Sequence, residues 1–428
     1  MKGIVIKGGE RLVGEVQVSG AKNAALPALA AALLVEGTCT FAQCPRLRDV
    51  DTFQVLLENL GARLEWNGEN ELQVDASGLT RATAPYDLVK TMRASILILG
   101  PLLARMGEAE VSLPGGCAIG ARPVGLHLKG LEQLGAQIEL EHGYIKAQAK
   151  RLRGTHLYLD IPTVTGTENL MMAAALAEGT TVIENAACEP EVEDLAHVLT
   201  AMGAQIEGAG TSEVTIRGVE RLHPITYGVM PDRIEAATLM VAAGITKGNI
   251  LIKGCRLEHM EAVVSKLREV GMEISSPAAG EVRAVGASRV RSTDVKTLPY
   301  PGFPTDMQAQ VMALMTVANG LSAVTETIFE NRFMHVSELN RMGADIRVQG
   351  PTAIVTGVPQ LSGAPVMATD LRASASLVLA GLAAQGQTVI SRAYHLERGY
   401  EDLVGKLAAL GATVQEVELD DEDTGEQE

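Results

Sequence analysis

The sequence predicts an α/β protein of two domains, each built from three copies of one α/β module. The chain has 428 residues, which is longer than a single hydrophobic core usually supports. Hydrophobic residues make up 46% of it but aromatic residues only 3%, a composition typical of closely packed helices and strands rich in Ala, Leu, Val and Ile. The third observation is a unit that recurs six times along the chain and sets the order of the elements.

Each unit begins with an Ala-rich helical stretch and continues through a glycine turn, a β-like run, an amphipathic helix, a Gly-Ala pair and another β-like run. The closing pairs recur at intervals of 68 to 74 residues. This regularity predicts a repeated module with two helices. The glycines of these pairs, followed by Ala in every unit except the fourth, are Gly61, Gly135, Gly203, Gly271, Gly343 and Gly411.

A glycine also follows the Ala-rich helix of every unit, where a helix C-terminus favours a residue that can turn left-handed. The second helix, for example 193–207 (EDLAHVLTAMGAQIE), has apolar residues at i, i+3, i+4 and i+7. This spacing predicts a helix with one buried face. The glycines after the first helices are Gly37, Gly107, Gly179, Gly248, Gly320 and Gly386.

The segments outside the units complete the predicted organisation. Two alternating runs, 3–8 (GIVIKG) and 14–20 (GEVQVSG), predict strands that must join a sheet, although the pattern does not say which one. Three units per domain predict a linker at 227–232 (YGVMPD). From residue 418 the tail carries seven acidic residues and no basic one, so we predict that it is disordered.

Charge and hydropathy exclude several classes of partner. The net charge is −16, or about −9 without the tail, which disfavours nonspecific binding to nucleic acid. The longest apolar run, 24–35, has 12 residues and is too short for the ~20 that a membrane helix needs. The N-terminus lacks the zones of a signal peptide. We therefore expect a cytoplasmic protein with neither nucleic acid nor membrane as a partner.

The first helices open in an unusual way. Each begins with Ser, Thr or Asp, which predicts caps for the first-turn N–H groups. Capping does not explain Lys22, Arg93 and Arg372 near these starts, because the helix dipole disfavours cations there. An anion site for phosphate or carboxylate would explain them. The alternative is that these cations are solvated or pair with neighbouring acids.

Asp306 occupies the corresponding place in the fifth unit, in PGFPTDMQAQ. An ordinary helix cap is one interpretation. Among helix ends that bind anions, however, a lone carboxylate is a candidate general base.

Cys117 lies in a glycine-rich segment, 112–125 (SLPGGCAIGARPVG), that predicts a mobile loop over a site. Nearby cations, Arg122 first, would lower the pKa of its thiol. The alternative is that Cys117 packs as a small apolar residue. With five cysteines and no CxxC pair, we expect free thiols, and for the following four a packed role: Cys39, Cys44, Cys188 and Cys255. Lone histidines such as His127 and His395 do not form a ligand cluster, so we expect no metal.

Seven motifs are spread along the chain, and the resemblance that they carry extends over nearly all of it apart from the acidic tail. They are SGAKNAALP (19–27), LVKTMRASI (88–96), LPGGCAIGARPVGLHLKGLEQLGA (113–136), PGFPTDMQAQ (301–310), FENRFMHVSEL (329–339), ATDLRASASLVLAG (368–381) and YHLERGYEDL (394–403). Together they resemble the motifs of the enolpyruvyl transferases, in particular those that act on UDP-N-acetylglucosamine in bacterial cell-wall synthesis.

The resemblance implies a fold of two inside-out α/β barrel domains with six βαβαββ repeats, three per domain. One domain would comprise residues 22–230 and carry the Cys117 loop. The other would comprise residues 1–21 and 231–428, with two chain crossings as a hinge.

The implied reaction moves the enolpyruvyl group of phosphoenolpyruvate to the 3-hydroxyl of UDP-N-acetylglucosamine and releases phosphate, as the first committed step of peptidoglycan precursor synthesis. Asp306 would take the proton of the sugar hydroxyl, and Cys117 would give a proton to C3 of phosphoenolpyruvate. The same thiol would be alkylated by fosfomycin. No metal or other cofactor is implied.

The resemblance also implies the binding residues. Catalysis would involve Lys22 and Arg398 beside Cys117 and Asp306. Phosphoenolpyruvate would be bound by Lys22, Asn23, Arg122, Arg332, Arg372 and Arg398. UDP-N-acetylglucosamine would be bound by Arg93, Arg122, Pro123, Val124, Gly125, Leu126, Thr163, Val164, Asp306 and Ile328. Many family members have Asp where this chain has Gly125, which bears on how the uracil ring is recognised.

Two rival functions are open. The shikimate-pathway enolpyruvyl transferase shares the fold and phosphoenolpyruvate but lacks the cysteine loop. A catalytically inert paralogue that binds a UDP-sugar or a protein is the other. The joint presence of Lys22, Cys117, Asp306 and Arg398 argues against an inert paralogue, because catalysis would need all four residues.

Overall fold

The computed structural model describes residues 1–113 and 124–419. The chain divides into two compact units. The terminal unit comprises residues 1–19 and 231–419, and the middle unit comprises residues 20–113 and 124–230.

Among the described residues, the strands form six four-stranded sheets, three in each unit. In every sheet the first two strands are parallel and the others antiparallel. In the middle unit the sheets are β14 (Thr226–Gly228), β3 (Thr38–Ala42), β5 (Glu71–Asp75), β4 (Arg63–Asn67); β6 (Thr83–Ala84), β7 (Glu108–Ser112), β9 (Tyr144–Gln148), β8 (Gln137–Glu141); and β10 (His156–Tyr158), β11 (Thr180–Glu184), β13 (Glu213–Arg217), β12 (Gln205–Glu207).

The sheets of the terminal unit repeat this arrangement, which confirms the predicted fold class of repeated α/β modules. They are β2 (Val13–Gln17), β15 (Asn249–Lys253), β17 (Glu281–Val285), β16 (Glu273–Ser275); β18 (Val295–Lys296), β19 (Leu321–Thr325), β21 (Thr352–Thr356), β20 (Asp345–Gln349); and β22 (Pro365–Met367), β23 (Gln387–Ser391), β1 (Lys2–Lys7), β24 (Thr413–Glu418).

The two N-terminal runs form β1 and β2, and both join sheets of the terminal unit. β1 pairs with β23 and β24, and β2 pairs in parallel with β15. Segments more than 380 residues apart in the chain thus lie side by side in one sheet.

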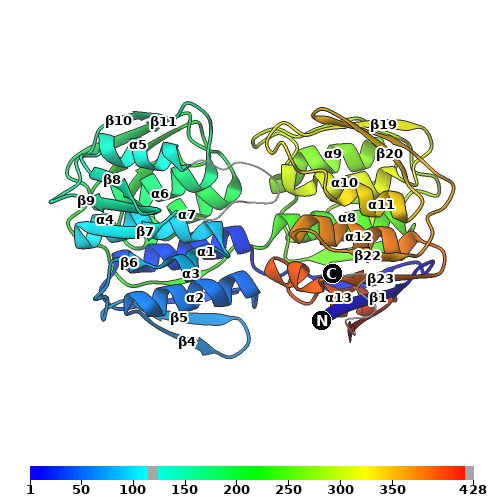
Figure 1. The fold of residues 1–428 in the computed structure, drawn as a ribbon, viewed down its shortest axis with the longest axis horizontal. Helices are drawn as coiled ribbons and strands as arrows, with labels where there is room; N and C mark the ends of the chain where they lie inside the picture. Colours follow the sequence, from blue (N-terminus) through cyan, green and yellow to red (C-terminus); the bar gives the residue numbers. More distant parts are fainter. Residues whose placement is uncertain (114–123, 420–428) are drawn as a thin grey trace. The chain divides into compact units, whose positions relative to one another are not determined.

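The first helix of each module is buried on all sides, as its continuous apolar sequence predicts. Every residue of α8 is buried, and α8, α10 and α12 pack against one another at the centre of the terminal unit (Figure 1). The inner helices are α1 (Lys22–Ala31), α4 (Leu99–Met106), α6 (Val164–Ala174), α8 (Arg233–Ile245), α10 (Gln308–Met315) and α12 (Leu371–Ala383). Short 3₁₀ helices precede two of them: η2 (Arg93–Ile98) before α4, and η4 (Thr305–Met307) before α10.

The second helix of each module is amphipathic and has a solvent-exposed face. In α2, for example, Val50, Phe53 and Leu57 are buried whereas Val55 is exposed. These helices are α2 (Arg48–Leu60), α5 (Gly125–Gln133), α7 (Pro190–Ala201), α9 (Glu261–Glu269), α11 (His335–Arg341) and α13 (Leu403–Ala409). The remaining helical segments are α3 (Tyr86–Val89), η1 (Ala32–Leu34), η3 (Leu257–Met260) and η5 (Ala393–Arg398).

The predicted turn glycines are confirmed with one exception. All six glycines of the closing pairs have φ between 89° and 109°. Of the glycines after the first helices, Gly248 alone lacks a positive φ, because Lys247 takes the left-handed conformation instead (φ 53°). Gly248 is needed for a different reason: a Cβ there would lie 2.4 Å from the Leu12 carbonyl oxygen.

Within the described residues, none of the helices is long and apolar enough to cross a membrane. The cysteines in this part of the chain are free thiols, and Cys39, Cys44 and Cys255 are buried as predicted, with Cys188 partly exposed. Burial raises the pKa of Cys255 to about 11, with a further contribution from Glu258, so this thiol is inert at neutral pH.

Candidate active site

Asp306 lies between two guanidinium groups in the terminal unit. Its Oδ2 accepts hydrogen bonds from Arg372 Nε (3.2 Å) and Nη2 (3.0 Å), and its Oδ1 lies 2.8 Å from Arg332 Nη2. Asp306 belongs to η4, Arg372 to the first turn of α12, and Arg332 to the segment before α11. The starts of two inner helices therefore meet at one carboxylate.

Arg372 is held as a cation although it is only 2% exposed. Burial alone would lower the pKa of its guanidinium, but Tyr400, Asp306 and Asp232 together raise that pKa above its usual range. The guanidinium carbon lies 5.2 Å from the centre of the Tyr400 ring. Its Nη1 is buried and has no hydrogen-bond partner among the described residues. The Arg372 guanidinium is therefore a buried cation whose Nη1 can donate a further hydrogen bond.

Asp306 is not the helix cap that one interpretation proposed. Neither η4 nor α10 has a side-chain cap, since the Asp306 carboxylate binds the two arginines instead. Capping is confirmed at Asp232 for α8 and at Asp370 for α12, each of which accepts two first-turn N–H groups. In α6 the cap is Thr163, two residues before the start that the repeat suggested, and at α1 and η2 the expected side-chain caps are absent.

In the middle unit, Lys22 is the first residue of α1. Its ammonium group lies 3.2 Å from Oδ2 of Asp49, a residue of α2, and both side chains are largely buried. Asn23 follows on the exposed side. Lys22 and Arg372 each pair with an acid, and neither is a solvated surface residue; an anion site at these helix starts stays a prediction.

The segments predicted to bind the nucleotide sugar are joined by two buried side chains. Asn169 of α6 donates to the Ile96 carbonyl (2.9 Å), accepts from the Gly100 N–H (2.6 Å) and contacts His127 Nδ1 (3.1 Å). His127 Nε2 lies 3.4 Å from the Thr165 hydroxyl. Burial first, and then nearby Arg93, lowers the pKa of His127 to about 4, so the ring is neutral at pH 7. Asn169 and His127 therefore hold η2, α5 and α6 together.

The structure places the other predicted residues as follows. Val124 and Thr163 precede α5 and α6, which begin with Gly125 and Val164, and Leu126 is partly buried. A Cβ at Gly125 would meet no atom of the described residues within 4 Å, so their packing does not require glycine there. Arg398 ends η5 and is partly buried. The Ile328 N–H donates to Glu326 (2.8 Å). Cys117, Arg122 and Pro123 lie outside the described residues.

Several residues of these networks were not predicted from the sequence. Asp49, Glu326 and Tyr400 contact predicted site residues, and Asn169 joins the elements that carry some of them, but none of the four follows a local motif of its own. His127 was noticed only as a lone histidine. The one available signal was a polar residue inside an otherwise apolar helix, as at Asn169 in NLMMAAALA.

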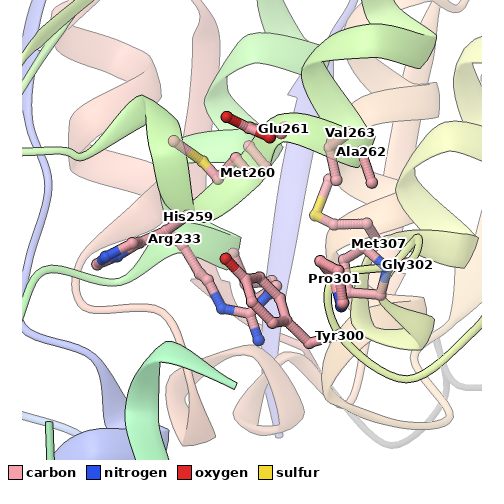
Figure 2. A pocket seen from close by; sticks show the side chains of 13 residues that line it. Arg233, His259, Met260, Glu261, Ala262, Val263, Tyr300, Pro301, Gly302 and Met307 are labelled. Carbon is pink, nitrogen blue, oxygen red and sulfur yellow. The ribbon is translucent and has the colours of Figure 1, made fainter. Parts of the chain in front are cut away.

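A pocket lies beside Tyr300, Gly302 and Met307, in the segment that also contains Asp306 (Figure 2). Met307 and Pro304 line one side of it, and the Arg233 guanidinium lies 5.6 Å from the centre of the Tyr300 ring. None of the predicted site residues that the structure describes lines this pocket. Across residues 1–113 and 124–419, no group of three or more His, Cys, Asp or Glu side chains could hold a metal ion.

Comparison with known proteins identifies the family. The family model for EPSP synthase (3-phosphoshikimate 1-carboxyvinyltransferase) matches residues 6–407. The chain belongs to this family of enolpyruvyl transferases. Among enolpyruvyl transferases of known structure, NikO from Streptomyces tendae superposes with a TM-score of 0.87 at 28% identity and covers 97% of this chain and 98% of its own. EPSP synthase from Acinetobacter baumannii has a TM-score of 0.76 at 18% identity, with 97% and 100% covered, and supports the fold alone.

Relatives within the enolpyruvyl transferases are closer in sequence than these structures. A protein of Desulfosudis oleivorans named UDP-N-acetylglucosamine 1-carboxyvinyltransferase is 60% identical over 418 residues, covering 97% of this chain and 100% of the relative. A protein of the same name from Geobacter metallireducens is also 60% identical, over 417 residues, covering 97% and 100%. The similarity thus extends over both units.

Proposed function

We propose that this chain transfers the enolpyruvyl group of phosphoenolpyruvate to the 3-hydroxyl of UDP-N-acetylglucosamine and releases phosphate, a step in peptidoglycan precursor synthesis. The observation that carries this proposal is full-length identity of about 60% to relatives that bear the name of this transferase. The cluster of Asp306, Arg332 and Arg372 supports it, because the reaction needs a base beside cations that bind an anionic donor.

In the proposed addition step, the sugar hydroxyl attacks C2 of phosphoenolpyruvate while Asp306 takes the hydroxyl proton. Cys117 gives a proton to C3, so the product of this step is a tetrahedral ketal that still carries phosphate. In the elimination step the bond from C2 to the phosphate oxygen breaks, a proton leaves C3, and the vinyl ether forms. The charge that develops on the donor is stabilised by preorganised cations.

The ion pairs of Asp306 give this scheme a physical basis. A carboxylate that two guanidinium groups contact is a weak base, because its charged form is stabilised. A donor with a phosphate and a carboxylate would compete for the N–H groups of Arg372, and each contact that it takes over makes Asp306 more basic, while the contact with Arg332 keeps the carboxylate in place. The buried Nη1 of Arg372 is a further donor for such an anion. Donor binding would therefore activate the base.

The remaining binding roles are proposed from the family motifs. Lys22, Asn23, Arg122 and Arg398 would bind phosphoenolpyruvate with Arg332 and Arg372. Arg93, Arg122, Pro123, Val124, Gly125, Leu126, Thr163, Val164, Asp306 and Ile328 would bind the nucleotide sugar. Because both proposed substrates are charged and do not cross a lipid bilayer, we propose that the protein works in the cytoplasm.

The deciding experiment measures phosphate release from phosphoenolpyruvate with three acceptor conditions: UDP-N-acetylglucosamine, shikimate 3-phosphate, and no acceptor. We expect release with the nucleotide sugar alone. Release with shikimate 3-phosphate would favour the activity in the name of the matching family model. The absence of release in every condition would favour an inert paralogue.

A further inference from the structure

Glu326, the residue directly after β19, has a buried carboxylate that accepts four hydrogen bonds and is 3% exposed. Its Oε1 accepts from the Thr297 hydroxyl (2.8 Å), the Ile328 N–H (2.8 Å) and the Phe329 N–H (3.2 Å). Its Oε2 accepts from the Thr305 hydroxyl (2.8 Å). Four donors contact this carboxylate, three on Oε1 and one on Oε2, so its position is closely defined.

The bond to Thr305 determines which way that hydroxyl points. An ionised carboxylate can only accept, so the single hydroxyl proton of Thr305 is directed at Glu326. The lone pairs of the Thr305 oxygen then face Arg332, whose Nη1 donates to it at 2.9 Å. The Thr305 hydroxyl therefore links the Glu326 carboxylate to the Arg332 guanidinium group, and the position of the first helps to fix the position of the second.

Arg332 in turn contacts the proposed base. Its Nη2 lies 2.8 Å from Asp306 Oδ1, its carbonyl accepts from Gln308 Nε2 at 3.0 Å, and the residue is 5% exposed. Because the guanidinium group is planar and rigid, fixing Nη1 on Thr305 also fixes Nη2 against Asp306.

We propose that Glu326 is a positioning residue of the transfer reaction, which orients Arg332 against Asp306 through the Thr305 hydroxyl and holds the Ile328 segment through its backbone N–H. The inference rests on the proposed function, since it assigns Asp306 the role of base. Glu326 itself touches neither substrate in this scheme. Its effect depends on its being an acceptor toward Thr305.

Substituting Glu326 by Gln separates its two functions. The amide oxygen can still accept from Thr297 and Ile328, so the Ile328 segment stays in place. The amide NH₂ now faces Thr305, and the hydroxyl oxygen meets donors from both the amide and Arg332. The chain from Thr305 to Asp306 is disturbed while the fold around Ile328 is kept.

The test is steady-state kinetics with UDP-N-acetylglucosamine and phosphoenolpyruvate on the full chain. The variants are Glu326→Gln, Thr305→Val, which removes the hydroxyl, and Thr305→Ser, which keeps it. Thr293→Val is the matched control: it removes a buried hydroxyl that donates to Glu269 (2.7 Å) in the same unit, away from the Asp306 cluster. Thermal unfolding of each variant records any general loss of structure.

We expect Glu326→Gln and Thr305→Val to lower kcat about tenfold or more, with KM for the nucleotide sugar within about twofold. The acidic limb of their kcat profile should move to higher pH, because a carboxylate that loses a guanidinium contact holds its proton more tightly. Thr305→Ser should restore most of kcat, and Thr293→Val should leave it unchanged.

The outcomes distinguish this inference from the proposed function. An active wild type with a fully active Glu326→Gln variant would overturn the positioning role alone. An equal loss of kcat in Thr293→Val would also overturn it, since the effect would then be a general one. If Glu326→Gln does not fold, the comparison of Thr305→Val with Thr305→Ser decides. An inactive wild type would contradict the proposed function, and this inference as well.

Discussion

The Asp306 carboxylate accepts two hydrogen bonds from the Arg372 guanidinium, at 3.2 Å from Nε and 3.0 Å from Nη2. These residues are 66 positions apart in the chain and belong to the starts of two inner helices. Because Arg372 is 2% exposed, Asp306 supplies a charge that water cannot replace. This one carboxylate therefore affects both stability and the proposed chemistry.

Asp306→Asn should impair both properties. Loss of the base should lower phosphate release by about 100-fold or more. Loss of the charge leaves Arg372 and Arg332 less compensated, so the free energy of unfolding should fall by about 3 kcal/mol. Asp345→Asn is the control, because the Arg347 side chain lies 3.6 Å away and both groups are well exposed, with an expected change below about 1 kcal/mol. Substantial turnover by Asp306→Asn would exclude the base role.

Cys117 can be tested through its acidity. Cys117→Ser should still bind both substrates but turn over poorly, because a hydroxyl is a much weaker acid than a thiol. Cys117→Asp supplies a carboxyl group that can donate a proton and lacks the sulfur that fosfomycin would alkylate. Turnover should therefore persist in Cys117→Asp in the presence of fosfomycin. A Ser variant as active as the wild type would refute the role of Cys117 as the acid.

The six-fold repeat made much of the fold predictable. Glycines such as Gly61 and Gly411 mark the same turn in every module, and that turn requires a positive φ that other residues rarely adopt. The prediction was wrong at Gly248, where Lys247 makes the turn and the glycine allows close approach to Leu12 instead. A turn with positive φ and a close approach to a neighbouring backbone both favour glycine at nearly the same position, so the sequence alone could not show which of the two applies at Gly248.

The candidate site was predictable only in part. Cations at helix starts indicated Lys22 and Arg372, but their partners Asp49 and Asp306 lie 27 and 66 residues away. Which acid meets which cation depends on how the inner helices pack, and a single sequence contains no direct signal of that packing. Glu326 and Tyr400 were missed for the same reason: they act on site residues through tertiary contacts.

Asn169 should affect binding of the nucleotide sugar as well as stability. Asn169→Ala leaves the Gly100 N–H and His127 Nδ1 without their buried partner and removes one of the two hydrogen bonds to the Ile96 carbonyl, so the free energy of unfolding should fall by about 3 kcal/mol. Because Asn169 joins η2 to α5, KM for UDP-N-acetylglucosamine should also rise.

The control for Asn169 is Asn67→Ala, which breaks an exposed hydrogen bond to Glu71 of 2.7 Å and should change neither quantity. Kinetics are measured at a temperature at which both variants remain folded. A loss of stability in Asn169→Ala with an unchanged KM would show that Asn169 supports the core without organising the proposed binding segment.

Glu235 gives the stability of the terminal unit a distinct pH dependence. Burial is the main cause that raises the pKa of Glu235 from 4.5 to about 7; Lys406 opposes this shift, and Asp232 adds to it. Its carboxylate contacts the Lys406 ammonium and accepts from the Ser19 N–H at 3.2 Å. In the unfolded chain Glu235 loses its proton near pH 4.5, whereas the folded protein keeps it up to about pH 7. Between these values the folded state binds more protons, so stability falls as the pH rises through this window.

Glu235→Gln removes this slope, because glutamine does not titrate. His127 and His335, whose pKa values burial lowers to about 4, give a slope of the opposite sign, but they are present in both proteins and cancel in the comparison. The difference in unfolding free energy between wild type and variant should therefore change by about 2 kcal/mol between about pH 5 and about pH 7.5, in favour of the wild type at the lower pH. Denaturant unfolding at both pH values measures it, with the exposed Glu15→Gln variant as the control. If the unfolding free energies of wild type and Glu235→Gln change in parallel with pH, Glu235 is already ionised at about pH 5. The attraction of Lys406 would then outweigh the cost of burying the Glu235 carboxylate.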